Sequence, residues 1–141
     1  MKNKILLLGL FCCSLISAKA QVLLDKGAGK NSFPIVSSST NAVICFDGKD
    51  ATVVRKSASL FVDDVRRVTG QELKMDESKP GKVSARYAII AGTIGESGWI
   101  DALASRNKID TAAIAGSWER YMIEVVNNPV PGIKKAIVVA G

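Results

Sequence analysis

The sequence predicts a small α/β domain, with a mixed sheet, one main amphipathic helix over about residues 50–69 and a second, short helix. Two runs, "YAIIAG" at 87–92 and "KKAIVVAG" at 134–141, are apolar on both faces, as strands covered by helices on each side are. A stretch with helical spacing of its apolar residues lies between strand-like runs. Strands that alternate with helices along the chain are typical of the α/β class.

Three further runs complete the expected sheet. "NAVICFD" (41–47) reads as a strand closed by an Asp-Gly turn, and "ELKMD" (72–76) as a short strand. In "ERYMIEVV" (119–126) the odd-numbered residues from 121 to 125 are apolar and fall on one face, which is typical of a half-exposed strand. The predicted order is therefore strand, helix, strand, strand, short helix, strand, strand.

The main helix is predicted to begin with Asp50 as its N-cap and to end at Gly70, a glycine just past the last periodic residue. Apolar and small residues recur between them as one stripe: Val54, Ser57, Ala58, Phe61, Val65 and Val68. We expect Phe61 and Val65 to anchor this stripe to the sheet. Replacement of Phe61 by alanine would then cost about 3–5 kcal/mol, the usual range for a buried phenylalanine.

Charged side chains occupy the opposite side of this helix. Asp63 and Asp64 are adjacent, so they point about 100° apart and do not form a catalytic carboxylate pair. Asp63 is expected to pair with Arg67, one helical turn further on. Loss of that exposed pair in an Arg67→Ala variant would cost under about 1 kcal/mol.

The loop after the 87–92 strand contains three evenly spaced glycines, Gly92, Gly95 and Gly98, before a short helix expected from about Trp99 to Arg106. A strand, a glycine loop and a helix start can hold a phosphate, but the dinucleotide fingerprint is G-x-G-x-x-G and the spacing here is G-x-x-G-x-x-G. Glu96 would also place a negative charge beside the phosphate. The loop is therefore predicted to be a strand-to-helix turn.

The first twenty residues are predicted to be a cleavable signal peptide. Lys2 and Lys4 precede a short apolar stretch, and Ala18-Lys19-Ala20 is the small-x-small pattern that signal peptidase reads, so cleavage is expected after Ala20. Lipidation at Cys12 or Cys13 is the alternative, disfavoured because the large Phe11 stands where a small residue is required. The product, residues 21–141, is expected to be one domain in a secreted or periplasmic location, without a membrane anchor.

Charge and composition exclude several classes of function. The leader holds three lysines and no acids, so its removal lowers the formal net charge from +6 to +3, and no basic run is interleaved with aromatic residues. Nucleic acid is therefore not an expected partner. The chain has no histidine, which excludes Ser-His triads and most zinc sites. Cys45, the one cysteine left after processing, is expected to be a buried, inert thiol.

Three side chains invite a carbohydrate interpretation. Trp99 and Trp118 could stack on sugar rings, but both are predicted to be packing anchors, because tryptophan buries so much apolar area. Glu119 has the chemistry of a glycosidase acid, but nothing supplies it with a partner carboxylate at a defined distance. No catalytic, substrate-binding, cofactor-binding or metal-binding residue is assigned, and no cofactor is expected.

Three segments carry a resemblance to a known family: "SASLFVDDVRRVTGQEL" (57–73), "YAIIAGTIGESGWID" (87–101) and "GSWERYMIEVVNNPVPGIKKAIVVAG" (116–141). In this order they resemble the N-terminal domain of glycoside hydrolase family 115. The resemblance implies a large secreted enzyme that removes glucuronic acid or 4-O-methyl-glucuronic acid from xylan with inversion at the anomeric carbon. Inversion needs two carboxylates about 6.5–9.5 Å apart, and in this family they lie on a barrel C-terminal to the segments matched here.

The resemblance also sets expectations for this chain and its partners. The strand ending at Gly141 has no covering helix after it, so the chain is expected to be the front piece of a larger protein and inactive alone. Glucuronoxylan would be bound through the missing domains, and a homodimer of the full-length protein is left open. Two alternatives remain: a free-standing carbohydrate-binding or adaptor module, which needs Trp99 or Trp118 exposed, and a nucleotide-binding domain that uses the Gly92 loop.

Overall fold

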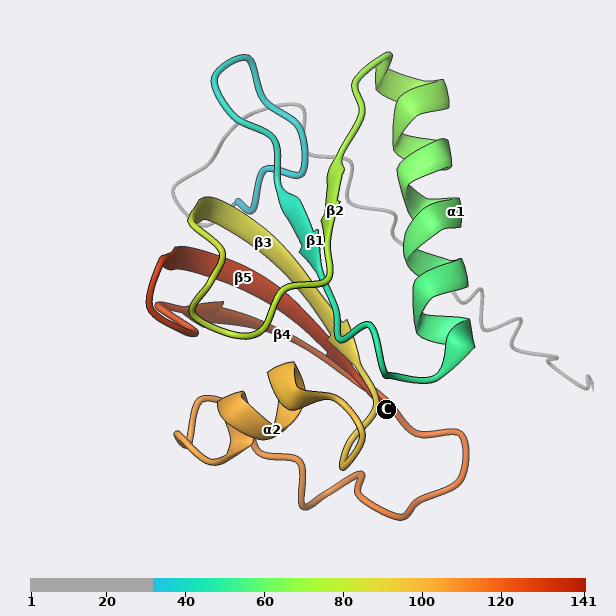
Figure 1. Cartoon of the computed structure of the whole chain (residues 1–141), viewed down its shortest axis with the longest axis vertical. Helices are drawn as coiled ribbons and strands as arrows, with labels where there is room; N and C mark the ends of the chain where they lie inside the picture. The colour runs from blue at the N-terminus through green and yellow to red at the C-terminus, as the bar shows by residue number, and fades with distance from the viewer. Residues whose placement is uncertain (1–31) are drawn as a thin grey trace, which may run out of the picture.

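The computed structural model describes residues 32–141 as an α/β domain in which one sheet is flanked by two helices (Figure 1). The predicted signal peptide and its cleavage point after Ala20 lie outside the described residues. The elements are β1 (Val43–Cys45), α1 (Thr52–Thr69), β2 (Lys74–Asp76), β3 (Ala85–Gly92), α2 (Gly98–Ala104), β4 (Met122–Asn127) and β5 (Ile133–Ala140). The predicted class and order of elements are thus confirmed. Neither helix of this part of the chain is long and apolar enough to cross a membrane.

The sheet is mixed, with the strand order β2-β1-β3-β5-β4. The first four strands in this order run parallel, and β4 pairs antiparallel with β5 at the edge. β3 and β5 form the centre: Ala85 lies beside Ile133 where they start, and Gly92 beside Ala140 where they end. These two strands are the ones that the sequence shows as apolar on both faces, which agrees with their central position.

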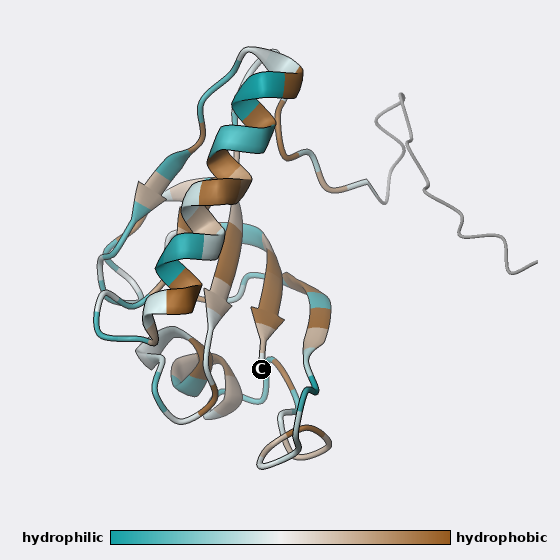
Figure 2. Ribbon diagram, turned by 90° about the vertical axis from the view of Figure 1, so that its right-hand side faces the viewer, coloured by the Kyte–Doolittle hydropathy of each residue, from teal (hydrophilic) through white to brown (hydrophobic). Residues whose placement is uncertain are grey.

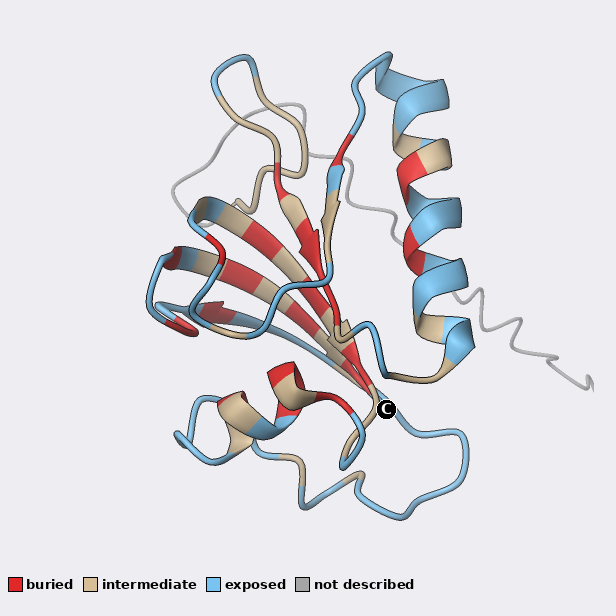
Figure 3. Ribbon diagram, viewed as in Figure 1, coloured by how far each residue is buried: buried red, intermediate tan, exposed pale blue. Residues whose placement is uncertain are grey.

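The two helices cover opposite faces of the sheet and create two hydrophobic clusters. On one face, Ala58 and Val62 of α1 pack with Ile44 and Phe46 from β1 and the residue after it. On the other face, α2 contributes Trp99, Ile100 and Leu103 to a larger cluster over β3 and β5. Figure 3 shows the buried residues gathered along the central strands, with exposed residues on the outer side of α1.

The ends of α1 agree only in part with the prediction. Ala51 occupies the N-cap position, and Asp50 instead accepts hydrogen bonds from the backbone N–H of Ala51 (2.7 Å) and of Thr93 (2.9 Å). The predicted N-cap role of Asp50 is therefore wrong, because its carboxylate is used to bind a loop distant in sequence. Gly70 ends the helix as predicted, with φ 70° and its N–H donating to the Arg66 carbonyl at 2.8 Å.

The buried stripe of α1 agrees only in part with the predicted one: Ala58 is buried, and Val54 and Val65 pack against the same cluster, as predicted. Phe61 is 37% exposed and Val68 85% exposed, whereas the unpredicted Val62 is only 8% exposed. Arg55 pairs with Glu77 just after β2, so its flank of the helix faces the β2 edge. Phe61, six positions on, lies about 120° around the helix from Arg55, on the flank away from β1 and β2. Phe61 is thus not the predicted buried anchor, and Phe61→Ala should cost less than the range of about 3–5 kcal/mol for a buried phenylalanine.

The ion pairs on α1 also differ from the expected one. Asp63 accepts from Arg66 at 3.1 Å, and Arg67 lies 3.6 Å from Asp64, so both pairs have i, i+3 spacing instead of the predicted Asp63–Arg67 pair. All four side chains are substantially exposed, and such pairs contribute little to stability.

Val62→Ala and Val68→Ala make the same chemical change at a buried and an exposed position of α1. Val62→Ala removes buried methyl groups and should lower the free energy of unfolding by about 1.5–3 kcal/mol. Val68→Ala should change it by less than about 0.5 kcal/mol, because the side chain is already in solvent and alanine favours helix. Urea unfolding of both variants measures the difference, and equal losses would contradict the observed buried face.

Candidate functional site

The place to look for a ligand site in this topology is the edge where the parallel strands end. In open α/β sheets, ligands bind outside the carboxyl ends of the strands, where neighbouring connections leave toward opposite faces. β1 and β3 are neighbours, and their connections lead to α1 and α2 on opposite faces. The residues at this switch point are 46–51 after β1 and 93–98 after β3.

Three aspartates hold the glycine loop at this switch point. Asp47 Oδ2 accepts from the backbone N–H of Gly98 at 3.1 Å, and Asp50 Oδ2 accepts from that of Thr93 at 2.9 Å. Asp101, in α2, accepts from the N–H of Gly95 at 3.2 Å. Two of these contacts join residues more than forty positions apart, so they tie the β1–α1 connection to the β3–α2 connection.

The remaining amides of the loop are also engaged. The N–H of Ile94 donates to the Gly141 carbonyl at 3.0 Å, and those of Glu96 and Ser97 donate to the Thr93 carbonyl at 3.2 and 2.9 Å. Every backbone N–H from 93 to 98 therefore has an acceptor within the chain. A phosphate site needs such groups to point at the ligand, and here carboxylates surround them. The predicted strand-to-helix turn is confirmed.

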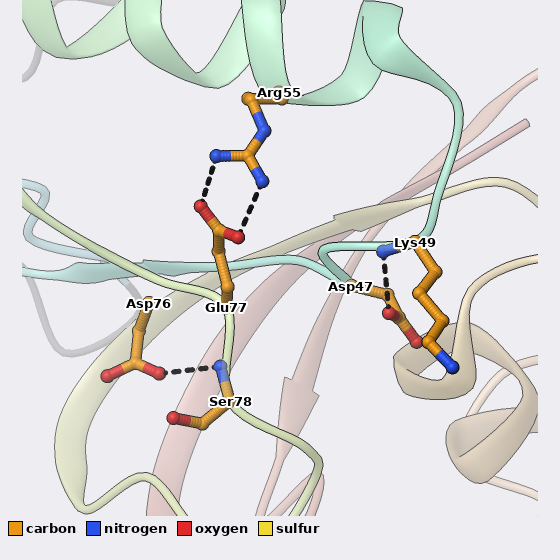
Figure 4. Close-up of polar contacts among 6 residues, drawn as sticks. All are labelled: Asp47, Lys49, Arg55, Asp76, Glu77 and Ser78. Atoms are coloured by element: carbon orange, nitrogen blue, oxygen red, sulfur yellow. Dashed lines mark hydrogen bonds and ion pairs between the residues drawn. The ribbon is translucent and has the colours of Figure 1, made fainter.

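A second group of acids lies at the end of β2 and directly after it, as Figure 4 shows. The two terminal guanidinium nitrogens of Arg55, Nη1 and Nη2, donate to the two carboxylate oxygens of Glu77. Asp76 accepts from Lys74 Nζ and from the backbone N–H of Ser78, both at 2.9 Å. The bond from Lys74, followed by those from Ser78, lowers the pKa of Asp76 below its usual 3.8. Each of these carboxylates therefore has a structural partner.

The hydrogen bonds to Asp47 predict an acid-sensitive loop. The N–H groups of Lys49 and then Gly98 lower the pKa of this carboxyl group below 3.8. The ionised form is thus favoured in the folded state, so its contribution to stability is complete above pH 3.8 and is lost as the pH falls through the lower folded pKa.

Asp47→Asn should flatten this part of the pH dependence. Between about pH 6 and about pH 2.5, the wild type should lose more free energy of unfolding than Asp47→Asn, measured by urea titration at each pH. Asp50→Asn neutralises the other carboxylate that binds this loop, and it is measured in the same way for comparison. The same loss in wild type and Asp47→Asn would show that Asp47 does not hold the loop.

The two tryptophans have different environments. Trp99 is fully buried, and its indole N–H donates to the Ser78 carbonyl at 2.8 Å, so its predicted role as a packing anchor is confirmed. Trp118 is 87% exposed, and the same prediction for it is wrong. It precedes β4 in a polar connection, beside Glu119, which has a left-handed backbone with φ 53° and is exposed. None of the ion pairs within residues 32–141 includes Glu119.

Cys45 is buried at the end of β1, as expected for an inert thiol. Burial, with a smaller effect of the negative Asp76, raises the pKa of this thiol to about 12. The nucleophilic thiolate is therefore negligible at neutral pH.

Within residues 32–141 no three His, Cys, Asp or Glu side chains are grouped so that they could hold a metal ion. No model of a known protein family matches the chain, and no curated protein matches it either. The fold and the site together define a small α/β domain with a carboxylate-bound turn at its switch point.

The hydrogen bonds from loop amides to Asp47, Asp50 and Asp101 were not predicted from the sequence. The Asp-Gly pair after the first strand was the one local signal of a special turn there.

Proposed function

We propose that this chain is an accessory α/β domain of a secreted xylan α-1,2-glucuronidase of the kind found in glycoside hydrolase family 115. In this proposal the domain supports the catalytic barrel and does not itself hydrolyse the glucuronosyl linkage. The resemblance of three segments motivates the proposal, and three features of the fold support it.

The first feature is the placement of the resembling segments. Residues 57–73 contain most of α1, 87–101 contain most of β3, the glycine loop and the start of α2, and 116–141 contain β4 and β5. β3 and β5 pair along their whole length, so segments far apart in the sequence are neighbours in the centre of the sheet. The resemblance therefore involves the core of the domain, where packing constrains the sequence most.

The second feature, and the one that carries the proposal, is an exposed apolar sheet face. Ile89 packs under α1, Ile137 lies beside it on β5, and Val125 lies beside Ile137 on β4, so all three share the face that α1 covers only in part. In Figure 2 the brown, apolar strands beside α1 are uncovered in this view. On β4, Ile123 and Val125 are 63% and 48% exposed, and Tyr121, just before the strand, is 69% exposed.

The flank of α1 that carries Phe61 extends this surface, since Phe61 and Val68 lie close together around the helix and are 37% and 85% exposed. Apolar surfaces of this kind are rare on isolated domains and mark places where another domain or protein docks. In the proposed enzyme this surface faces the domain that carries the catalytic barrel.

The third feature is the state of the acids. Inverting hydrolysis requires one carboxyl group as general acid and one as general base, with space for a water between them. At the carboxyl edge of the sheet, Asp47 and Asp50 are instead bound to backbone amides, and Glu77 and Asp76 to Arg55 and Lys74. They stabilise loops, which supports a domain whose chemistry is done elsewhere in the protein.

The test compares residues 21–141 with the protein expressed from the complete reading frame, using glucuronoxylan as substrate. Released uronic acid is measured by chromatography. We expect release by the complete protein and none above blank by residues 21–141. Release by residues 21–141 would overturn the proposal, and Glu119 would then be mutated first. No release by the complete protein, with the substrate verified by a known glucuronidase, would also overturn it.

A free-standing carbohydrate-binding module is the second candidate, and exposed Trp118 favours it. Its indole is available to stack on a sugar ring, and the exposed Tyr121 is three residues away. Retention of the chain on insoluble xylan, lost in Trp118→Ala and kept in Val68→Ala, would support this candidate. The nucleotide-binding alternative gains no support, because the amides of the Gly92 loop are already bound.

A further inference from the structure

The edge where β3 and β5 start carries the opposite charge from the edge where they end. Aspartates surround the loops at the carboxyl ends, as described above. At the amino ends lie two adjoining cavities, of about 820 and 490 Å³, which share Ser84, Gly132 and Lys134 in their walls. Both are wide open to solvent, although their volumes are in the range of small-molecule sites.

The walls of these two cavities contain cationic but no acidic side chains. Arg86, Lys134 and Lys135 line the larger cavity, and Arg106, Lys108 and Lys134 line the smaller one. Ser84, Thr40 and Asn41 add hydroxyl and amide groups to the walls. A cleft lined by one sign of charge concentrates counter-ions, so an anion is the favoured occupant.

The strand register brings the cations together. Tyr87 lies directly opposite Lys135, and Ala85 opposite Ile133, so Arg86 and Lys134 between these pairs are neighbours across the strands. Like charges opposite each other in a sheet are destabilising. The ion pairs among residues 32–141 do not include Arg86, Lys134 or Lys135, so no carboxylate of the described chain offsets this repulsion.

Aromatic rings hold Arg86 in place, and a backbone carbonyl holds Lys135. The Arg86 guanidinium carbon lies 5.6 Å from the centre of the Tyr87 ring, a cation–π distance. Phe33 packs edge-on against the same ring, with centroids 5.5 Å apart. Lys135 Nζ donates to the Ser32 carbonyl at 3.5 Å. Arg86 and Lys134 are exposed, and their donors are therefore accessible to a ligand.

We propose that this basic edge binds an anionic sugar, with the carboxylate of a uronate residue held by Arg86 and Lys134. Arginine binds a carboxylate through two parallel hydrogen bonds, and lysine adds a second charge. Ser84, Thr40 and Asn41 are the groups available to the sugar hydroxyls. The choice of a uronate rests on the proposed function, in which the substrate carries glucuronic acid branches. Nucleic acid is disfavoured, because the cavity walls offer no row of exposed aromatic rings for stacking bases.

The test titrates the ¹⁵N-labelled full chain with sodium glucuronate, followed by NMR. We expect chemical-shift changes at residues 40–41, 84–87 and 132–135, and none at equal concentrations of neutral glucose. Arg86→Gln combined with Lys134→Gln should weaken glucuronate binding by about tenfold or more, as loss of charge-assisted contacts implies. The matched control, Lys56→Gln combined with Arg67→Gln on exposed α1, removes the same charges and should leave the affinity unchanged.

Several outcomes would overturn this site. They are no shift with glucuronate, equal shifts with glucose, shifts outside these residues, or equal weakening in both double variants. Tighter binding of a short oligouridylate than of glucuronate, lost in the Arg86 and Lys134 variant, would assign the edge to nucleic acid instead. If that variant fails to fold, the comparison of glucuronate with glucose in the wild type still decides.

Failure of this site and failure of the proposed function give different results. Glucuronate binding at residues 84–87 and 132–135, with no uronic acid released by the complete protein, would retain the site and reject the proposed enzyme. Uronic acid release by the complete protein, without glucuronate binding at these residues, would retain the proposed enzyme and reject the site.

Discussion

Replacement of Trp99 by alanine should lower the free energy of unfolding by about 3–5 kcal/mol, a large part of the 5–15 kcal/mol typical of a domain. Trp99 is fully buried in the cluster between α2 and the sheet, and its indole N–H binds the Ser78 carbonyl. The substitution would leave a cavity under α2 and release the connection that follows β2. Urea or thermal unfolding of the purified variant measures the loss.

Two further variants separate the causes of this loss. Trp99→Phe keeps most of the ring but removes the donor, so it should cost less than Trp99→Ala. Trp118→Ala makes the same large change at an 87% exposed side chain and should cost less than about 0.5 kcal/mol. Similar losses in Trp99→Ala and Trp118→Ala would contradict the burial that distinguishes the two tryptophans.

The two tryptophans also show what sequence patterns determine and what they leave open. The central strands were predicted to within two residues, because runs apolar on both faces have few other positions in a covered sheet. The side of α1 that packs was predicted less well. Neighbouring helical residues point about 100° apart, so the position of the sheet decides between Phe61 and Val62. That position depends on the tertiary structure, which helical periodicity does not contain.

The candidate site was less predictable still. Asp47 and Asp50 bind amides 51 and 43 positions further along the chain, and local propensity carries no information about such contacts. The same holds for the basic edge, where Arg86 and Lys134 are brought together only by the register of β3 and β5. In both places the functional argument depends on pairing between distant segments.

Gly92→Ala should be strongly destabilising, and the reason is packing under the loop and not flexibility of the backbone. A Cβ at this position would lie 2.3 Å from Ser97 Oγ, 2.5 Å from Ser97 Cβ and 2.9 Å from Ile100 Cγ1. Ser97 and Ile100 are both fully buried, so α2 would have to move away from β3. Overpacking of this kind costs about 1–3 kcal/mol or more. Gly98→Ala is the matched control, because its Cβ would approach only the Asp47 carboxylate, at 3.0 Å.

A second substitution at Ser97 tests that cause. Among the described residues Ser97 Oγ has no hydrogen-bond partner, so Ser97→Ala alone should be nearly neutral, and it should not rescue Gly92→Ala because its Cβ remains. Ser97→Gly removes the Cβ as well. The Gly92→Ala/Ser97→Gly protein should therefore be more stable than the sum of the single changes predicts, by about 0.5–3 kcal/mol, the usual range for residues in contact. Urea unfolding of the four proteins gives this coupling energy. Strict additivity would mean that room for Ser97 is not the reason for Gly92, and the contact with Ile100 Cγ1, at 2.9 Å, would be the remaining steric cause.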